Sequence, residues 1–185
     1  MNKSEIRKKI LKIRKKNFSN KNQIDFSSII KILKQSKCNK KKIGGYWAYN
    51  YEIDIMPVLE KFEKLNYPIS LPKIGKKKEM NFFEWSNEDP LAINKFGIPE
   101  PVSKKKKYPD ILLVPIVAYD KNLNRIGYGG GFYDRYIGKI KKLKKVITIG
   151  FAYSFQKIKK VPTDKYDVKL DFIINEKKIK WEFYF

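Results

Sequence analysis

The chain has 185 residues, a length that predicts a single domain spanning residues 1–185 with a continuous core. Lysine and arginine number 42 against 19 acidic residues, giving a net charge of +23, and there is one cysteine and no histidine. This composition excludes an internal disulfide, zinc sites of the Cys/His kind, Ser-His-Asp triads and Cys-His dyads.

The N-terminus lacks an apolar signal core, and no apolar run approaches the roughly 20 residues of a membrane span. We therefore expect a cytoplasmic protein with no membrane partner, and we expect a monomer. The positive charge would suit a nucleic acid, but nearly all of it is scattered lysine, and the arginines are Arg7, Arg14, Arg125 and Arg135. Specific nucleic-acid readers favour arginine, so we do not expect nucleic-acid binding to be the main function.

In the first third of the chain, apolar residues at helical spacing predict an amphipathic helix over Ser4–Lys16, with its basic residues on the opposite face. A second helix is expected over Asp25–Lys37, followed by a strand over Ile43–Tyr49. Asp54 is predicted as the N-cap of a third helix that has Pro57 in its first turn.

The middle of the chain predicts short strands over Tyr67–Leu71 and Met80–Trp85. Prolines block a helix in Phe96–Pro101, which is expected as an extended loop. The lysine-rich segment Ser103–Lys107 is expected as a solvated loop.

The run Ile111–Ala118 is the most apolar stretch, and its lack of alternation predicts a central strand covered on both faces. After it we expect a helix and three strands, over Phe132–Lys142, Val146–Phe151, Asp171–Ile174 and Lys180–Phe185. Alternating strands and helices predict an α/β fold, a Rossmann-like three-layer sandwich with a largely parallel central sheet. Ligands bind such sheets at the carboxyl ends of the strands.

A glycine-rich loop joins the apolar strand to the next helix, with the sequence Gly127-Tyr128-Gly129-Gly130-Gly131-Phe132-Tyr133-Asp134-Arg135. In this context backbone N–H groups and the helix dipole converge on an anion, and phosphate is the expected guest. Asp134 is placed to hold Mg²⁺ against phosphates, and Arg135 supplies a cation. The alternative is a plain tight turn in which Asp134 complements the helix dipole. The spacing matches neither a Walker A loop nor a dinucleotide fingerprint.

The segment from Asn124 to Ile137 resembles the signature of the 5-formyltetrahydrofolate cyclo-ligase family. Val161–Asp171 is similar to that family's C-terminal motif and Phe96–Pro101 to its middle motif, so the resemblance covers almost the whole chain. It implies conversion of 5-formyltetrahydrofolate and ATP to 5,10-methenyltetrahydrofolate, ADP and phosphate. A phosphorylated formyl group is the implied intermediate, and ATP and Mg²⁺ are required.

The resemblance also implies roles for particular residues. ATP contacts are expected from Lys3, Arg7, Gly127, Tyr128, Gly129, Gly130, Gly131, Phe132, Tyr133, Asp134 and Arg135. Contacts to the folate are expected from Trp47, Glu52, Gly130, Gly131, Phe132 and Tyr133. The implied metal ligands are Asp134 and Asp171, and the implied catalytic residues are Arg135 and Tyr133.

Each of these assignments has a simpler alternative. Lys3 and Arg7 also suit a solvated helix face, Glu52 a surface position before a helix, and Asp171 a turn at a strand end. Tyr166, Gly130 and Asn175 depart from the residues common in the family. For the whole protein, a nucleic-acid-binding role and another phosphoryl-transfer reaction, such as that of a small kinase, remain the competing hypotheses.

Overall fold

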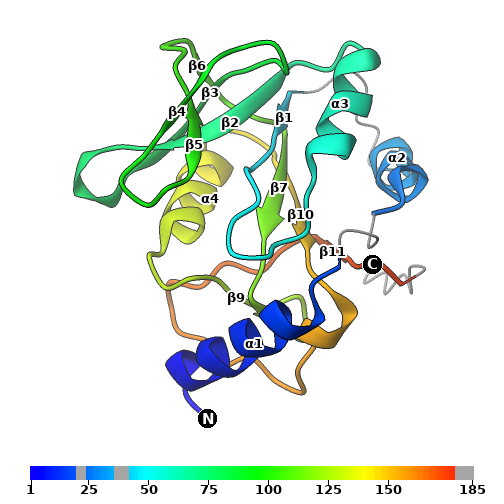
Figure 1. Cartoon of the computed structure of the whole chain (residues 1–185), viewed down its shortest axis with the longest axis vertical. Helices are drawn as coiled ribbons and strands as arrows, with labels where there is room; N and C mark the ends of the chain where they lie inside the picture. Colours follow the sequence, from blue (N-terminus) through cyan, green and yellow to red (C-terminus); the bar gives the residue numbers. More distant parts are fainter. Residues whose placement is uncertain (20–23, 36–41, 178–185) are drawn as a thin grey trace.

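The computed structural model describes residues 1–19, 24–35 and 42–177, and its centre is a seven-stranded sheet (Figure 1). The strand order is β11 (Phe172–Ile174), β10 (Ile147–Phe151), β7 (Ile111–Pro115), β1 (Ile43–Gly44), β2 (Ile69–Ile74), β3 (Met80–Glu84) and β6 (Lys106–Lys107). The first five strands of this order are parallel, while β3 pairs antiparallel with both β2 and β6. The prediction of a largely parallel sheet is confirmed.

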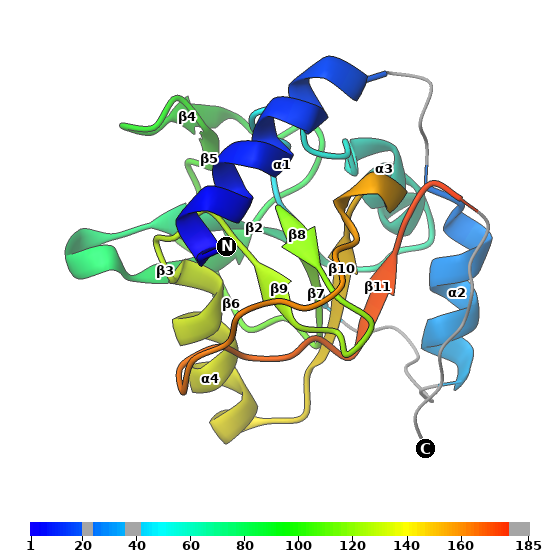
Figure 2. The same cartoon turned by 90° about the horizontal axis from the view of Figure 1, so that it is seen from below.

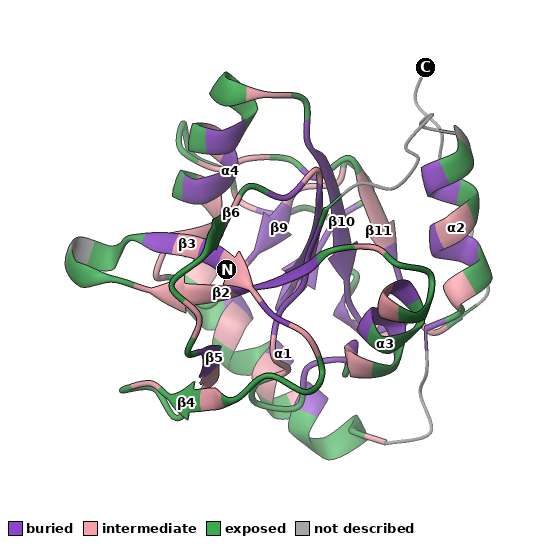
Figure 3. Ribbon diagram, turned by 90° about the horizontal axis from the view of Figure 1, so that it is seen from above, coloured by how far each residue is buried: buried purple, intermediate pink, exposed green. Residues whose placement is uncertain are grey.

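Helices cover both faces of the sheet. On one face α2 (Phe26–Gln35) and α3 (Met56–Lys64) bury Ile29 and Phe62 against a core that includes Ile111 and Leu113 of β7. On the other face α4 (Phe132–Leu143) packs against Leu112 and Val114 of the same strand, because successive strand residues point to opposite faces. The central strands are therefore buried throughout (Figure 3), and the predicted three-layer sandwich is confirmed.

The helix α1 (Lys3–Asn17) lies across the carboxyl end of the sheet instead of on a face (Figures 1 and 2). Its residues Ile6 and Ile10 pack against the short hairpin of β8 (Ala118–Tyr119) and β9 (Arg125–Ile126). An Asn2–Glu5 capping box fixes the start of the helix. This position brings the first turns of α1 to the end of the sheet where ligands bind in α/β folds.

Several predicted boundaries were wrong. The strand expected over Ile43–Tyr49 ends at Gly44, after which the chain leaves the sheet. Asp54 is not the N-cap of α3, which is Ile55; the Asp54 carboxylate instead accepts a hydrogen bond from the Met56 amide, 2.9 Å away. The strand expected over Ile111–Ala118 ends at Pro115, which has no N–H to continue the ladder.

Two segments expected as loops contain strands. Pro99–Pro101 is β5 and pairs with β4 (Leu91–Ile93), and within Ser103–Lys107 the last two residues form β6 at the sheet edge. A 3-10 turn, η1 (Lys76–Lys78), closes the β2–β3 hairpin, and another, η2 (Ser154–Gln156), follows β10. The strand predicted over Lys180–Phe185, the end of the second helix at Lys37 and the cysteine Cys38 lie outside the described residues.

Within the described ranges, no helix combines the length and apolar character needed to cross a bilayer.

Candidate active site

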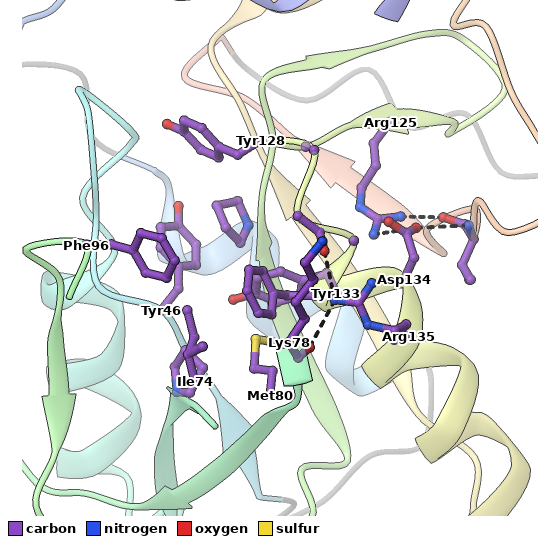
Figure 4. A pocket seen from close by; sticks show the side chains of 18 of the residues that line it. Tyr46, Ile74, Lys78, Met80, Phe96, Arg125, Tyr128, Tyr133, Asp134 and Arg135 are labelled. Atoms are coloured by element: carbon purple, nitrogen blue, oxygen red, sulfur yellow. Dashed lines mark hydrogen bonds and ion pairs between the residues drawn. The ribbon is translucent and has the colours of Figure 1, made fainter. Parts of the chain in front are cut away.

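A cavity of about 1580 Å³ opens at the carboxyl end of the parallel strands. In Figure 4, Tyr46, Ile74 and Phe96 line the left side of it, Arg135 lies on the right, and Tyr128 lies at the top. The walls come from the glycine loop with the start of α4, from the β2–β3 hairpin, from the β4–β5 hairpin and from the first turns of α1. Segments far apart in sequence therefore meet around one space.

The glycine loop adopts backbone dihedral angles that are unfavourable for residues with a side chain. Gly129 and Gly131 have φ values of 97° and 66°, in the left-handed region, and Gly131 is the N-cap of α4. A Cβ on Gly131 would lie 2.6 Å from Nη1 of Arg135. The N–H groups of the first turn of α4 have no helical acceptor and face the cavity end of the helix, which is the arrangement of an anion site.

Two arginines hold the loop through its carbonyl groups. Nε of Arg7 donates to the carbonyl oxygen of Gly127 at 2.7 Å. Nη2 of Arg135 donates to the carbonyl oxygens of Gly130 at 2.7 Å and of Lys78 at 2.9 Å (Figure 4). Both guanidinium groups thus place positive charge at the loop, where it complements an anionic ligand.

Lys3 lies beside this loop and contacts two acidic residues of the cavity wall. Its ammonium group is 2.7 Å from a carboxylate oxygen of Asp164 and 2.5 Å from one of Asp167. Burial lowers the pKa of Lys3, but the hydrogen bonds to the two carboxylates outweigh burial and the net shift is upward. Lys3 and Arg7 therefore both line the cavity, and a purely solvated role for them is wrong.

Asp134 lines the cavity one turn into α4, but one of its oxygens already has two donors. Its Oδ1 accepts from Nη2 of the buried Arg125 at 2.8 Å and from the Val168 amide at 3.2 Å (Figure 4). Magnesium is commonly held by one or two carboxylates together with substrate phosphates. Asp134 beside a phosphate-binding loop fits that mode of coordination.

Asp171 does not join Asp134. Its Oδ2 accepts from the amide and hydroxyl of Thr148 at 2.8 and 2.6 Å, and it pairs with Lys141 at 3.3 Å. Asp171 precedes β11, at the amino end of the parallel strands, and it is not part of the cavity wall. Among the described residues no cluster of three potential metal ligands occurs. The structure therefore does not support Asp171 as a ligand of a metal at this cavity.

Glu52 lines the cavity and is buried, with 5% of its surface exposed, so the alternative of a surface glutamate is wrong. Its Oε2 accepts from the Tyr49 amide at 2.9 Å across a tight turn. Burial raises the pKa of Glu52 to about 7, although the Tyr49 amide, Arg14 and Tyr128 all act to lower it. Trp47, the other residue expected at the folate, lines the same cavity and packs partly against the core.

Phe132 and Tyr133 begin α4 and complete the wall next to the glycine loop. The guanidinium carbon of Arg135 lies 5.5 Å from the centre of the Phe132 ring. The Tyr133 hydroxyl is buried without a hydrogen-bond partner among the described residues, and burial raises its pKa well above the ordinary value. A buried phenol with a free donor and acceptor at a cavity is suited to contact a polar ligand.

Sequence reasoning missed other members of the site. Tyr46, Lys78, Phe96 and Arg125 line the cavity, and Arg14 reaches its edge through Tyr128. Arg14 was detectable, because Lys3, Arg7, Ile10 and Arg14 recur at helical spacing and share one face. Phe96 begins the segment that resembles the family's middle motif, but neither Phe96 nor Tyr46 has a periodic pattern that indicates a place in the wall, because that place depends on loops folding back over the sheet.

Fold and site together define an α/β protein with a glycine loop before a helix N-terminus, at the carboxyl edge of a parallel sheet. The model of the 5-formyltetrahydrofolate cyclo-ligase family matches residues 1–176. A 5-formyltetrahydrofolate cyclo-ligase of Haemophilus influenzae is 34% identical over 137 residues, covering 70% of this chain and 73% of the relative. The enzyme of the same name from Escherichia coli K12 is 28% identical over 147 residues, covering 76% and 80%.

Solved structures agree with these relatives. The 5,10-methenyltetrahydrofolate synthetase of Aquifex aeolicus superposes with a TM-score of 0.76 at 33% identity, covering 96% of this chain and 91% of that one. The Mycoplasma pneumoniae synthetase gives a TM-score of 0.74 at 27% identity, covering 96% and 100%. The chain belongs to the 5-formyltetrahydrofolate cyclo-ligase family and is a ligase.

Proposed function

We propose that this ligase uses ATP to cyclise 5-formyltetrahydrofolate to 5,10-methenyltetrahydrofolate, with release of ADP and phosphate. The observation that carries the proposal is that one cavity is lined by both the glycine loop before α4 and the buried carboxylate of Glu52. The loop offers N–H donors to a polyphosphate, and the carboxylate offers an acceptor to a ring system rich in N–H donors. A cytoplasmic location, a monomeric state and a single domain over residues 1–185 remain predictions.

The phosphates of ATP belong at the glycine loop in this proposal. The free N–H groups at the start of α4, the guanidinium groups of Arg7 and Arg135 and the ammonium group of Lys3 surround that position. Together they neutralise the charge that moves onto the phosphates during transfer. Mg²⁺, held by Asp134 and the phosphates, supplies further charge neutralisation there.

The folate belongs at the end of the cavity that contains Glu52 and Trp47. A pterin presents adjacent N–H donors, which an ionised carboxylate accepts as a pair. The aromatic side chains of Tyr46, Phe96 and Tyr133 provide apolar walls for the rings. In this orientation the formyl group faces the glycine loop.

The chemistry follows from activating a poor leaving group. The formyl oxygen attacks the γ-phosphorus, and the bond between that phosphorus and the β-phosphate oxygen of ADP breaks. The formyl group is thereby converted to an iminium phosphate. N10 then attacks the formyl carbon and loses its proton, and departure of phosphate leaves the methenyl bridge. The steps depend on positioning and charge neutralisation, so the lack of histidine is no obstacle. Arg135 and the Tyr133 hydroxyl are the groups we place at the reacting atoms.

The test is near-ultraviolet absorbance after mixing the protein with 5-formyltetrahydrofolate, ATP and Mg²⁺, because the methenyl product has an extended chromophore. We expect the band to grow only when ATP and Mg²⁺ are both present. Folded protein that gives no band refutes the proposal. A stable phosphorylated small molecule in place of free phosphate would favour a kinase.

A further inference from the structure

Arg14 is an arginine in an unusual place. It lies in the last turn of α1 and is only 1% exposed. Nη1 donates to the Ile116 carbonyl oxygen at 3.2 Å, Nη2 donates to the Tyr128 hydroxyl, and Nε has no partner among the described residues. Within those residues no carboxylate lies at ion-pair distance from it. A buried cation without a direct counter-ion is costly, so its presence requires another reason.

The Tyr128 hydroxyl connects Arg14 to Glu52. Tyr128 accepts from Arg14 and donates to the carbonyl oxygen of Tyr49 at 3.2 Å. The amide of the same Tyr49 donates to the Glu52 carboxylate at 2.9 Å, and the Tyr128 hydroxyl also acts to lower the pKa of Glu52. Further contact comes from the Arg14 guanidinium, whose carbon lies 5.5 Å from the centre of the Tyr128 ring. The cation and the carboxylate are thus linked through the Tyr128 hydroxyl and the backbone of Tyr49.

This connection joins two segments of the site. Tyr128 belongs to the glycine loop, whereas Glu52 belongs to the turn after β1. Arg14 itself does not line the cavity, so it contacts neither substrate directly. We propose that Arg14 is a positioning residue that, through the Tyr128 hydroxyl, holds the Glu52 carboxylate ionised and oriented for the folate. The inference rests on the proposed function, because it assumes that Glu52 accepts N–H groups of the folate.

The proposal predicts a specific pH dependence. The titratable and charged groups around Glu52 come from α1, the segment after β1, the glycine loop, α4 and the segment after β10, and they are Arg14, Tyr46, Asp54, Tyr128, Tyr133 and Tyr153. Burial raises the pKa of each of these four tyrosines, so they stay neutral at pH 6–9. Arg14 is the cation of this group, and its removal must raise the pKa of Glu52 further.

The experiment compares Arg14→Met, Arg14→Lys and Tyr128→Phe with the wild-type enzyme, measuring kcat and KM for both substrates from pH 6 to 9. With Arg14→Met we expect the KM for the folate to rise about fivefold at pH 7 and to return to nearly the wild-type value at pH 9, where Glu52 ionises without help. Tyr128→Phe keeps the ring but removes the shared hydroxyl, and we expect it to shift the same profile. Arg14→Lys keeps the charge and should restore much of the wild-type profile.

Lys15→Met is the matched control, since it removes a cation from the next, exposed position of α1. It should leave both KM profiles unchanged. If Arg14→Met lowers thermal stability but leaves the pH profile of the folate KM unchanged, Arg14 is only structural and the proposal is overturned. An equal change in the KM for ATP and for the folate at every pH would also overturn it.

A readout independent of turnover separates this inference from the proposed function. The ¹³C resonance of the Glu52 side-chain carboxyl, assigned by its loss in Glu52→Gln, reports the titration directly. We expect its midpoint to move to higher pH in Arg14→Met and in Tyr128→Phe. Wild-type protein that forms no methenyl product defeats the proposed function, whereas an unmoved carboxyl titration defeats the role of Arg14 alone.

Discussion

Glu52 is an acid placed where its ionisation is unfavourable to folding. Its pKa in the folded protein is about 7 and its ordinary value is 4.5, with burial as the main cause. The folded state therefore binds more protons than the unfolded state between these values, and stability falls as pH rises through that window. Carboxylates that bind a ligand, and whose ionisation lowers the stability of the ligand-free protein, are common at functional sites.

We predict that Glu52→Gln stabilises the protein without ligand by about 2–3 kcal/mol at pH 8, because the amide has no charge to bury. Near pH 4 the two proteins should differ little, since Glu52 is then neutral in both states. Urea unfolding at both pH values measures this. The same substitution should raise the KM for the folate, and an unchanged KM would remove Glu52 from the folate site.

Asp134 and Asp171 provide a matched pair for the metal assignment. Each carboxylate accepts hydrogen bonds from the protein, but only Asp134 lines the cavity. We predict that Asp134→Asn lowers turnover on the order of 10²-fold and weakens the dependence on Mg²⁺. Asp171→Asn should leave both unchanged. Turnover measured against Mg²⁺ concentration decides between them, and equal effects of the two substitutions would contradict the structure.

Asp134 also contributes to the stability of the fold, because it is the ion-pair partner of Arg125, whose side chain is 4% exposed. Loss of the negative charge should therefore cost about 1–2 kcal/mol in unfolding free energy. Asp171→Asn should cost a similar amount, so a comparison of the two variants separates a catalytic effect from a stability effect.

At the scale of elements, α1 connects helix capping to ligand binding. The Asn2 side chain accepts from the Glu5 amide at 3.0 Å, and Lys3 and Arg7 follow in the first two turns. We predict that Asn2→Ala costs about 1 kcal/mol, frays the start of α1 and raises the KM for ATP severalfold. The control is Asn17→Ala at the other end of the helix, which should leave that KM unchanged. Unfolding and initial-rate measurements test both variants.

The regular elements of the fold were predictable from local patterns. The periodicity of α1, the unbroken apolar run of β7 and the glycine loop before α4 each specify their own conformation. The edges of elements were not, because they depend on tertiary contacts: β6 exists only because β3 offers it a partner, and β1 is short because the chain turns toward the cavity.

The candidate site was predictable in the same measure. Residues in the glycine loop and on α1 carry a pattern in the sequence, and the structure brings them together. Asp171 shows the limit of predicting site residues from sequence, because its motif gives no information on which end of the sheet its carboxylate occupies. Arg14 shows another, since a basic residue on an amphipathic helix is normally solvated, whereas Arg14 is buried with hydrogen bonds to Ile116 and Tyr128.

At the scale of the whole molecule, the excess of lysine reaches the mouth of the site. Exposed lysines occur around the cavity at Lys76, Lys78, Lys95, Lys139, Lys142 and Lys165. We predict that the KM for ATP rises severalfold between low salt and about 0.5 M salt while kcat changes little, because screening weakens the attraction of an anionic substrate. Initial rates over a salt series test this, and a KM independent of salt would show that these lysines do not attract ATP.

The position of α1 also has a consequence for synthesis of the protein. Arg7 contacts Gly127, 120 residues later, and Lys3 contacts Asp167, 164 residues later. On a ribosome this helix emerges long before the hairpin and loops that bury it. Its apolar face therefore has no packing partner until most of the chain has been synthesised. The nucleotide end of the site is therefore completed late in synthesis, and nascent chains stopped before Asp167 should have folded strands but no assembled cavity.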